Sequence, residues 1–234
     1  LHAARAVLAH AAVAVIADSP SLARSEFDAA LAFARSIGVE PVVVATDELD
    51  DPRYRANAGD RCYFCKATLF RAMTAWARRS GVTALAFGEI VDDQLDDRPG
   101  ARAAQEFAVH APLTRAGFTK EDVRRWAREH GLALAEKPSS ACLASRLPIG
   151  TSVTRERLAR IERSEARLRE LGLRQVRVRD HGVRARVETG ADEIEHAGRI
   201  VGELRGALQR EGFSEVELAV YRTAAERVRA AATS

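Results

Sequence analysis

The first half of the sequence alternates helical segments with short, continuous apolar runs, and this alternation limits the possible folds more than any other feature. The apolar runs cover 13–17, 42–45 and 84–87, and segments with helical apolar spacing separate them. A strand that is apolar on both faces is typical of a parallel sheet covered by helices. We therefore predict an α/β domain with a Rossmann-like parallel sheet.

The pattern changes in the second half of the chain. Segment 137–151 contains two prolines and no hydrophobic periodicity, which predicts a loop. Beyond it, a strongly charged helix is predicted over 154–171 and alternating strands over 175–179, 184–188 and 215–220. We therefore expect a first domain over 1–136, a linker carrying active-site residues over 137–151, and a smaller α+β domain over 152–234.

Charge and cysteine content narrow the class of protein. Lys plus Arg number 36 against 33 Asp plus Glu, and most of the basic residues are arginines. This balance favours local anion-binding sites over a broad polycationic surface. Three cysteines are too few for a disulfide scaffold, so we expect a reducing, cytoplasmic setting. No apolar run reaches the roughly 18 residues of a membrane span.

The three cysteines suggest a metal centre. Cys62 and Cys65 form a CxxC pair near a predicted helix start, and Cys142 lies in the loop 137–151. The pair alone fits a redox couple, half of a zinc site, or chance. With the third thiol and no histidine at short ligand spacing, three ligands and one open position favour a 4Fe-4S cluster over zinc.

Arginines mark a second candidate site. A two-residue turn at His181-Gly182 predicts that Arg179 pairs with Arg184 and Arg177 with Arg186, which places four arginines on one face of a hairpin. Like charges across a strand pair are destabilising unless counter-charges are present. Two sources stay open, either a bound phosphate or carboxylate, or the acidic residues of the neighbouring helix, namely Glu162, Glu165 and Glu170.

A cluster of acidic residues follows the third apolar run, at the edge where open α/β sheets bind ligands. It consists of Asp92, Asp93, Asp96 and Asp97. These carboxylates are suited to Mg²⁺, but we favour a solvated acidic loop.

Several motifs together resemble the LarE-type ATP-dependent sulfur transferases. The most specific are RCYFCK at 61–66 and KPSSACLASR at 137–146, and they stand in family order with ADSPS at 17–21, RPG at 98–100 and VRVR at 176–179. The resemblance implies a PP-loop ATP pyrophosphatase domain with an adenine nucleotide alpha hydrolase-like fold. The Ser-Gly-Gly-x-Asp-Ser loop of that fold is expected upstream of Leu1.

The resemblance also implies a reaction. These enzymes use ATP and Mg²⁺ to convert a carboxylate of pyridinium-3,5-biscarboxylic acid mononucleotide to a thiocarboxylate, in making the nickel-pincer nucleotide of lactate racemase. In one branch the enzyme's own cysteine gives up its sulfur once. In the other branch three cysteines hold a 4Fe-4S cluster that receives sulfide from a separate source. Ala141 stands at the sacrificial position, and Cys62, Cys65 and Cys142 match the cluster ligands; a one-residue shift would make Cys142 the single-use donor.

Other site residues follow from the same resemblance. The catalytic group is expected to comprise Cys142, Ser145, Arg146 and Glu165. Nucleotide and phosphate binding is assigned to Ser19, Gly88, Arg98, Arg177, Arg179, Arg186 and Arg222. The family also implies a homo-oligomer.

Two other functions remain open. A tRNA thiolase of the PP-loop type can use a similar cluster, but it needs a basic RNA-binding surface or zinc-ribbon cysteine pairs, which this sequence lacks. A non-catalytic zinc- or nucleotide-binding module is the alternative from another class. We expect a small mononucleotide as partner, and neither a nucleic acid nor a membrane.

Overall fold

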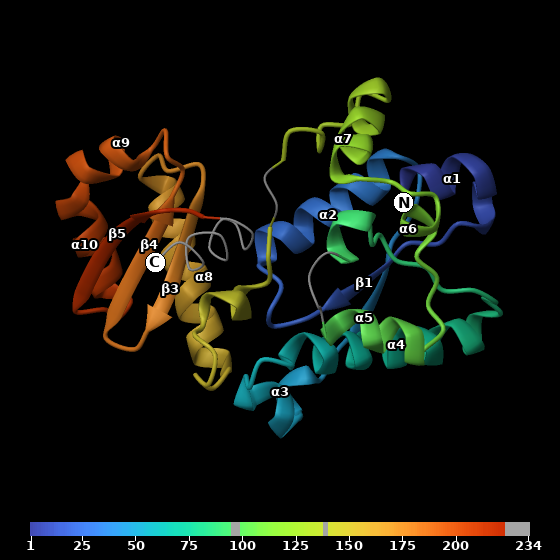
Figure 1. Cartoon of the computed structure of the whole chain (residues 1–234), viewed down its shortest axis with the longest axis horizontal. Coiled ribbons are helices and arrows are strands. Elements are labelled where there is room, and N and C mark those ends of the chain that lie inside the picture. Colours follow the sequence, from blue (N-terminus) through green and yellow to red (C-terminus); the bar gives the residue numbers. More distant parts are fainter. Residues whose placement is uncertain (95–98, 138–139, 223–234) are drawn as a thin grey trace. The chain divides into compact units, whose positions relative to one another are not determined.

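The computed structural model describes residues 1–94, 99–137 and 140–222. The chain divides into two compact units, Leu1–Ala141 and Cys142–Ser234 (Figure 1). The division falls inside the segment 137–151 in which we predict a linker. Each unit has its own sheet and its own buried core.

The first unit contains a parallel pair of strands, β1 (Val15–Asp18) and β2 (Val42–Ala45). They coincide with the first two apolar runs, so the prediction of parallel strands is confirmed for this pair. Helix α2 (Arg24–Ser36) makes the crossover that a parallel pair requires. It ends before Gly38, whose φ of 73° is a conformation that glycine adopts without strain.

The third apolar run, 84–87, is not a regular strand. It forms one parallel bridge, Ala86 to His110, in which the His110 amide donates to the Leu85 carbonyl at 2.8 Å. Among the described residues the parallel sheet therefore has two strands, and they do not form the full Rossmann-like sheet that we predict. The run is apolar because Leu85 and Phe87 pack on the core around Phe70.

Helix α4 (Arg61–Ser80) is central to that core. It begins at Arg61, so it includes both cysteines of the CxxC pair, which we expected only near a helix start. Ala67 and Phe70 on α4 pack against Ala103 and Ala104 on helix α5 (Pro99–Glu106). Small alanines on α5 allow the two helices to approach closely.

Shorter helices complete the first unit. Helix α7 (Lys120–Glu129) starts at a capping box, in which the Thr119 side chain accepts a hydrogen bond from the Asp122 amide and the Asp122 side chain accepts one from the Thr119 amide. The other helices are α1 (His2–Leu8), α3 (Pro52–Ala56) and α6 (Pro112–Arg115). Single 3₁₀ turns occupy Ala9–Ala11, Glu48–Asp50 and Val91–Gln94.

The second unit is a three-stranded mixed sheet packed against helices, and its strands lie where the alternating segments predict them. The strands are β3 (Val176–His181), β4 (Arg184–Thr189) and β5 (Glu215–Val220), in the order β3-β4-β5. Strands β3 and β4 are antiparallel, and β4 and β5 are parallel. One sheet face packs on helices α8 (Arg155–Glu170), α9 (Ile194–Arg199) and α10 (Val201–Arg210) through a fully apolar core.

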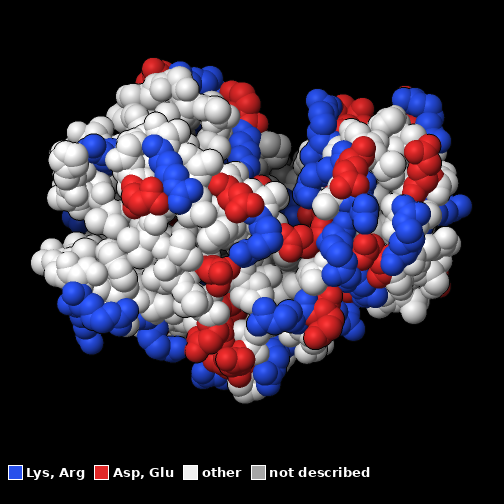
Figure 2. All heavy atoms as spheres, turned by 180° about the vertical axis from the view of Figure 1, so that it is seen from behind, with Lys and Arg blue, Asp and Glu red and all other residues white. Residues whose placement is uncertain are grey.

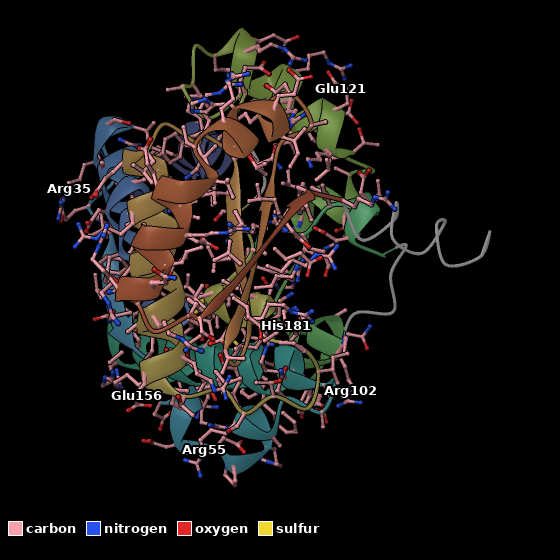
Figure 3. All side chains as sticks on the ribbon, turned by 90° about the vertical axis from the view of Figure 1, so that its left-hand side faces the viewer. Arg35, Arg55, Arg102, Glu121, Glu156 and His181 are labelled. Atoms are coloured by element: carbon pink, nitrogen blue, oxygen red, sulfur yellow. The ribbon has the colours of Figure 1, made fainter. Side chains whose placement is uncertain are left out.

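The hairpin register differs from our prediction. The turn is Gly182-Val183 rather than His181-Gly182, so Arg179 pairs with Arg186 and Arg177 with Glu188; His181 ends β3 (Figure 3). The register is shifted by two residues, which leaves every side chain on its predicted face, and hydrophobic alternation therefore cannot detect the error. The turn determines the register. Gly182 has a φ of 80°, and type I′ and II′ hairpin turns place a residue with positive φ at their first central position.

The helices of the described residues give no sign of a membrane span, since none is both long and apolar enough. On the face of the molecule in Figure 2, basic and acidic side chains are interspersed rather than gathered by sign.

Candidate functional site

The CxxC pair lies at the start of α4. Cys62 is exposed and Cys65 is partly buried, and neither forms a disulfide. Residues three apart on a helix lie on the same side, so Cys62 and Cys65 share one side of α4. The two residues between them are covered by cations: the guanidinium of Arg102 on α5 (Figure 3) lies 4.2 Å from the Tyr63 ring centre, and that of Arg53 lies 4.5 Å from the Phe64 ring centre.

Cys142 opens the second unit. It precedes the 3₁₀ turn Leu143–Arg146 and is partly buried. Its carbonyl accepts two hydrogen bonds, one from the Ser145 amide at 2.9 Å and one from Arg146 Nη1 at 3.1 Å. Arg146 Nη1 also donates to the Ser145 hydroxyl at 3.1 Å. The predicted Cys142, Ser145 and Arg146 are therefore in mutual contact.

Arg146 forms a buried, bidentate ion pair with Glu165 on α8. Arg146 Nε lies 2.8 Å from Glu165 Oε1 and Nη2 lies 3.2 Å from Oε2, and the two side chains are 5% and 2% exposed. Glu165 also accepts the Val178 amide of β3 at 3.1 Å and Arg169 Nη2 at 3.1 Å. Both carboxylate oxygens of Glu165 thus accept hydrogen bonds from the protein, so Glu165 stabilises the packing of α8, β3 and the Cys142 turn.

The arginine face of the sheet is neutralised from within the sheet. Arg179 Nε donates to Glu188 Oε1 at 2.6 Å, and Arg186 Nε lies 3.6 Å from Glu217 Oε1. Of the helix glutamates considered as counter-charges, Glu165 pairs with Arg146, and its charge also raises the pKa of Arg177, whereas Glu170 pairs with Arg167 on its own helix. We missed Glu188 and Glu217 because the arginine that each one meets depends on the pairing of β4 with β3 and with β5, which alternation along a strand does not give.

Arg177 has a different environment. Its guanidinium lies 4.1 Å from the ring centre of Tyr221, the residue after β5. Burial lowers the pKa of Arg177, and the nearby charges of Arg146 and Arg179 act in the same direction. An anion beside this guanidinium would relieve both effects. The predicted Arg222 follows Tyr221 and is exposed.

Two buried polar atoms on the same face have no hydrogen bond among the described residues. They are Arg186 Nε, a donor, and Glu188 Oε2, an acceptor. Buried polar groups are nearly always paired in folded proteins. Together with Arg177, they fit a polar, anionic ligand on this face of the second unit.

The predicted nucleotide-binding residues of the first unit are dispersed. Ser19, after β1, is buried and donates its hydroxyl to Glu48, a fully buried carboxylate after β2 that we did not predict. Gly88 is exposed, and Arg98 lies outside the described residues. Gly100 of the same motif leaves room for Lys66, whose Cδ would lie 2.8 Å from an added Cβ.

The two described residues of the acidic cluster, Asp92 and Asp93, accept hydrogen bonds from backbone amides. Asp92 accepts the Lys120 amide at 2.8 Å and Asp93 accepts the Ile90 amide at 3.2 Å, whereas Asp96 and Asp97 lie outside the described residues. These contacts support the loop interpretation over Mg²⁺ binding.

A cavity of about 520 Å³ in the first unit is lined by the start of β1, by Pro41 and by α2. It lies toward the amino ends of the strands, whereas ligands of α/β sheets bind at the carboxyl ends. We therefore do not assign a nucleotide to it.

No three His, Cys, Asp or Glu side chains are grouped for a metal ion anywhere in 1–94, 99–137 and 140–222. Cys62 and Cys65 belong to the first unit and Cys142 to the second. The three-cysteine site remains a prediction.

Comparison with known proteins places the chain among characterised and uncharacterised relatives. No protein-family model matches it. It is 40% identical over 214 residues to the uncharacterized protein slr1717 of Synechocystis, covering 91% of this chain and 80% of that protein. It is 29% identical over 172 residues to the uncharacterized protein MJ0830 of Methanocaldococcus jannaschii, covering 71% of this chain and 66% of that protein.

A third relative has a named activity. The chain is 35% identical over 175 residues to the pyridinium-3,5-bisthiocarboxylic acid mononucleotide synthase of Lactiplantibacillus plantarum. The match covers 75% of this chain but spans only 63% of the synthase. The chain therefore belongs to the same family as slr1717, and its similarity to the synthase agrees with the resemblance of its motifs to the LarE-type enzymes.

Proposed function

We propose that the chain is a sulfur transferase of nickel-pincer nucleotide synthesis, which converts a carboxylate of pyridinium-3,5-biscarboxylic acid mononucleotide to a thiocarboxylate at the expense of ATP. One observation carries the proposal. The thiol-bearing turn at Cys142 is hydrogen-bonded to Arg146 and, through the Ser145 carbonyl, to Arg179 Nη1 at 3.1 Å. A sulfur site and a guanidinium cluster thus belong to one rigid piece of the second unit.

The guanidinium groups suit the substrate's charge. Arginine binds phosphate and carboxylate through planar, charge-assisted hydrogen bonds. We assign the mononucleotide phosphate to Arg177, with Arg179, Arg186 and Arg222 contributing positive charge. Arg186 Nε makes no hydrogen bond and burial lowers the pKa of Arg177, and both observations support this assignment.

The reaction has two steps. A substrate carboxylate oxygen attacks the α-phosphorus of ATP, and pyrophosphate leaves with Mg²⁺. A sulfide supplied to the site then attacks the acyl carbon, and AMP leaves with the electrons of its bond to that carbon. We assign ATP to the carboxyl end of β1, where Ser19 lies, with Gly88 after the run 84–87 and Arg98 as further contacts.

The cysteines fit a 4Fe-4S cluster by their chemistry. None of the three forms a disulfide, and Cys62 and Cys65 lie on one side of α4. When bound, such a cluster supplies iron that holds exchangeable sulfide, which allows repeated turnover. Cys62, Cys65 and Cys142 would be its ligands.

The mixture of charges in Figure 2 supports a small substrate over RNA, since RNA-binding domains carry basic patches. A steep fall of tRNA affinity with salt would instead favour the tRNA thiolase. Bound zinc without iron would favour the non-catalytic module.

The deciding experiment is incubation of anaerobically purified protein with the biscarboxylate mononucleotide, MgATP and sulfide. We expect thiocarboxylate product in excess over protein, with AMP and pyrophosphate formed in equal amounts, by mass spectrometry. Product limited to one per chain, with Cys142 converted to dehydroalanine, would establish the single-use mechanism. Absence of both product and AMP would refute the proposal.

A further inference from the structure

The backbone around Cys142 has little regular structure to hold it. Ala141 is exposed, whereas Leu143 and Ala144 are 1% and 0% exposed, so Cys142 lies where the chain enters the interior. The turn that follows spans only Leu143–Arg146. Within the turn, the Ser145 amide holds the Cys142 carbonyl at 2.9 Å, and further support comes from outside the turn.

The Arg146 guanidinium supplies that support. It donates to the Cys142 carbonyl at 3.1 Å from one side and to both oxygens of Glu165 from the other. With the guanidinium 5% exposed, its orientation is set by these protein partners rather than by solvent. A planar bidentate pair of this kind has one preferred geometry.

Glu165 links the turn to the sheet. Its Oε1 accepts the Val178 amide at 3.1 Å, on the side of β3 that has no strand neighbour among the described residues. The other end of the turn is held in the same way, because Arg179 of β3 donates to the Ser145 carbonyl at 3.1 Å. The Cys142 turn is therefore attached at both ends to the strand that carries Arg177.

We propose that Arg146 and Glu165 are positioning residues, which hold the Cys142 thiol in register with the guanidinium groups of β3 without contacting the substrate. The proposal rests on the proposed function of Cys142 in sulfur transfer. It changes the role that the sequence predicts for this pair, because the two side chains bind each other and the backbone.

The first test measures how fast iodoacetamide alkylates Cys142 in the metal-free protein, with each cysteine followed separately by peptide mass spectrometry. Arg146→Lys keeps the charge but cannot make both the bidentate pair and the carbonyl bond. We expect Cys142 to react about tenfold faster, the effect of losing one charge-assisted hydrogen bond. Cys62 in the first unit is the internal reference and should react at its original rate.

Arg169→Gln is the matched control. It removes another guanidinium contact of Glu165, at 3.1 Å, but leaves the Cys142 turn untouched. Its Cys142 rate should equal that of the original protein. Equal Cys142 rates in Arg146→Lys and the original protein would overturn the proposal.

A paired Arg146→Met/Glu165→Met variant guards against misfolding, because apolar side chains of similar size often replace a buried ion pair without loss of stability. Its Cys142 should be alkylated as fast as that of Arg146→Lys.

Kinetics of sulfur transfer give a second test. Arg146→Lys should lower kcat and leave the KM for the mononucleotide unchanged. A raised KM with unchanged kcat would show substrate contact and overturn the positioning role. If the original protein transfers no sulfur but the alkylation difference holds, the proposed function fails and the support of Cys142 stands.

Discussion

Glu165 illustrates how a buried carboxylate depends on its partners. It faces Arg146, Arg169 and the Val178 amide. Glu165→Gln would leave the Arg146 charge uncompensated in the interior, and we expect the second unit to lose about 3–5 kcal/mol of unfolding free energy. Hydrogen exchange of the β3 and β4 amides measures this loss. Glu170→Gln, on the same helix but exposed, should change stability by less than about 0.5 kcal/mol; equal losses in both variants would contradict the assignment.

Arg177 is the residue in which ligand binding should be most evident. Its pKa is lowered by burial, so a bound phosphate would stabilise the charged form. Arg177→Gln should weaken binding of the biscarboxylate mononucleotide about 10- to 100-fold, measured by calorimetric titration. Arg184→Gln is the control, because Arg184 is half exposed and lies 3.9 Å from Glu217. Equal weakening by both substitutions would remove Arg177 from the site.

The sequence predicted which chemical groups belong to the site better than it predicted what each of them contacts. Cysteine spacing and arginine density mark the chemical groups of the site without knowledge of the fold. The partners Glu188 and Glu217 could not be assigned, because their proximity depends on strand register across β3, β4 and β5. The buried Glu48 escaped notice because a single acidic residue after a strand gives no signal of burial.

Helix α3 offers a test at the scale of one element. Asp51 is its N-cap and accepts from Arg53, which lowers the pKa of Asp51 from 3.8 to about 2. Because the folded pKa is the lower one, this stabilisation is present above about pH 4 and disappears as the pH falls toward 2. Asp51→Asn should therefore reduce stability at pH 7, by about 1 kcal/mol or less, and should make little difference near pH 2.

Urea titrations of the first unit at several pH values measure this difference. Asp50→Asn is the matched control, since Asp50 is exposed and precedes the cap. A loss for Asp51→Asn that is the same at all pH values would argue against the Arg53 interaction as its source.

The β3–β4 hairpin shows what an element's sequence can and cannot specify. Its strands and faces follow from alternation, but its register depends on the turn at Gly182, whose φ is 80°. Gly182→Ala should destabilise the second unit by about 1 kcal/mol. Gly202→Ala, within α10, should be neutral or stabilising because its backbone is helical. Thermal unfolding followed by circular dichroism compares the two variants, and a loss no greater for Gly182→Ala would refute the turn assignment.

At the scale of the molecule, the predicted metal ligands come from both units. If Cys62, Cys65 and Cys142 bind one 4Fe-4S cluster, loss of any one should release it. Cys62→Ala and Cys142→Ala should each lower iron and acid-labile sulfide severalfold, measured chemically after anaerobic reconstitution. Ser145→Ala, beside Cys142, should retain both. Full iron in either cysteine variant would contradict the three-ligand site.

The sequence predicted the strands of the second unit and the parallel pair of the first. It also predicted more strand than the described residues form, because an apolar run such as 84–87 fits a buried strand and a core segment equally well. A buried strand differs from an irregular core segment only in its pairing with a distant strand, and a local sequence pattern does not specify that pairing.

The division at Ala141 has a spectroscopic consequence. Both tryptophans, Trp76 and Trp126, precede it, so indole fluorescence reports on the first unit alone. Far-ultraviolet circular dichroism includes the helices of both units. Coincident midpoints from the two signals in a single titration are expected if the two units unfold as one cooperative block, and separate midpoints would show that they unfold independently.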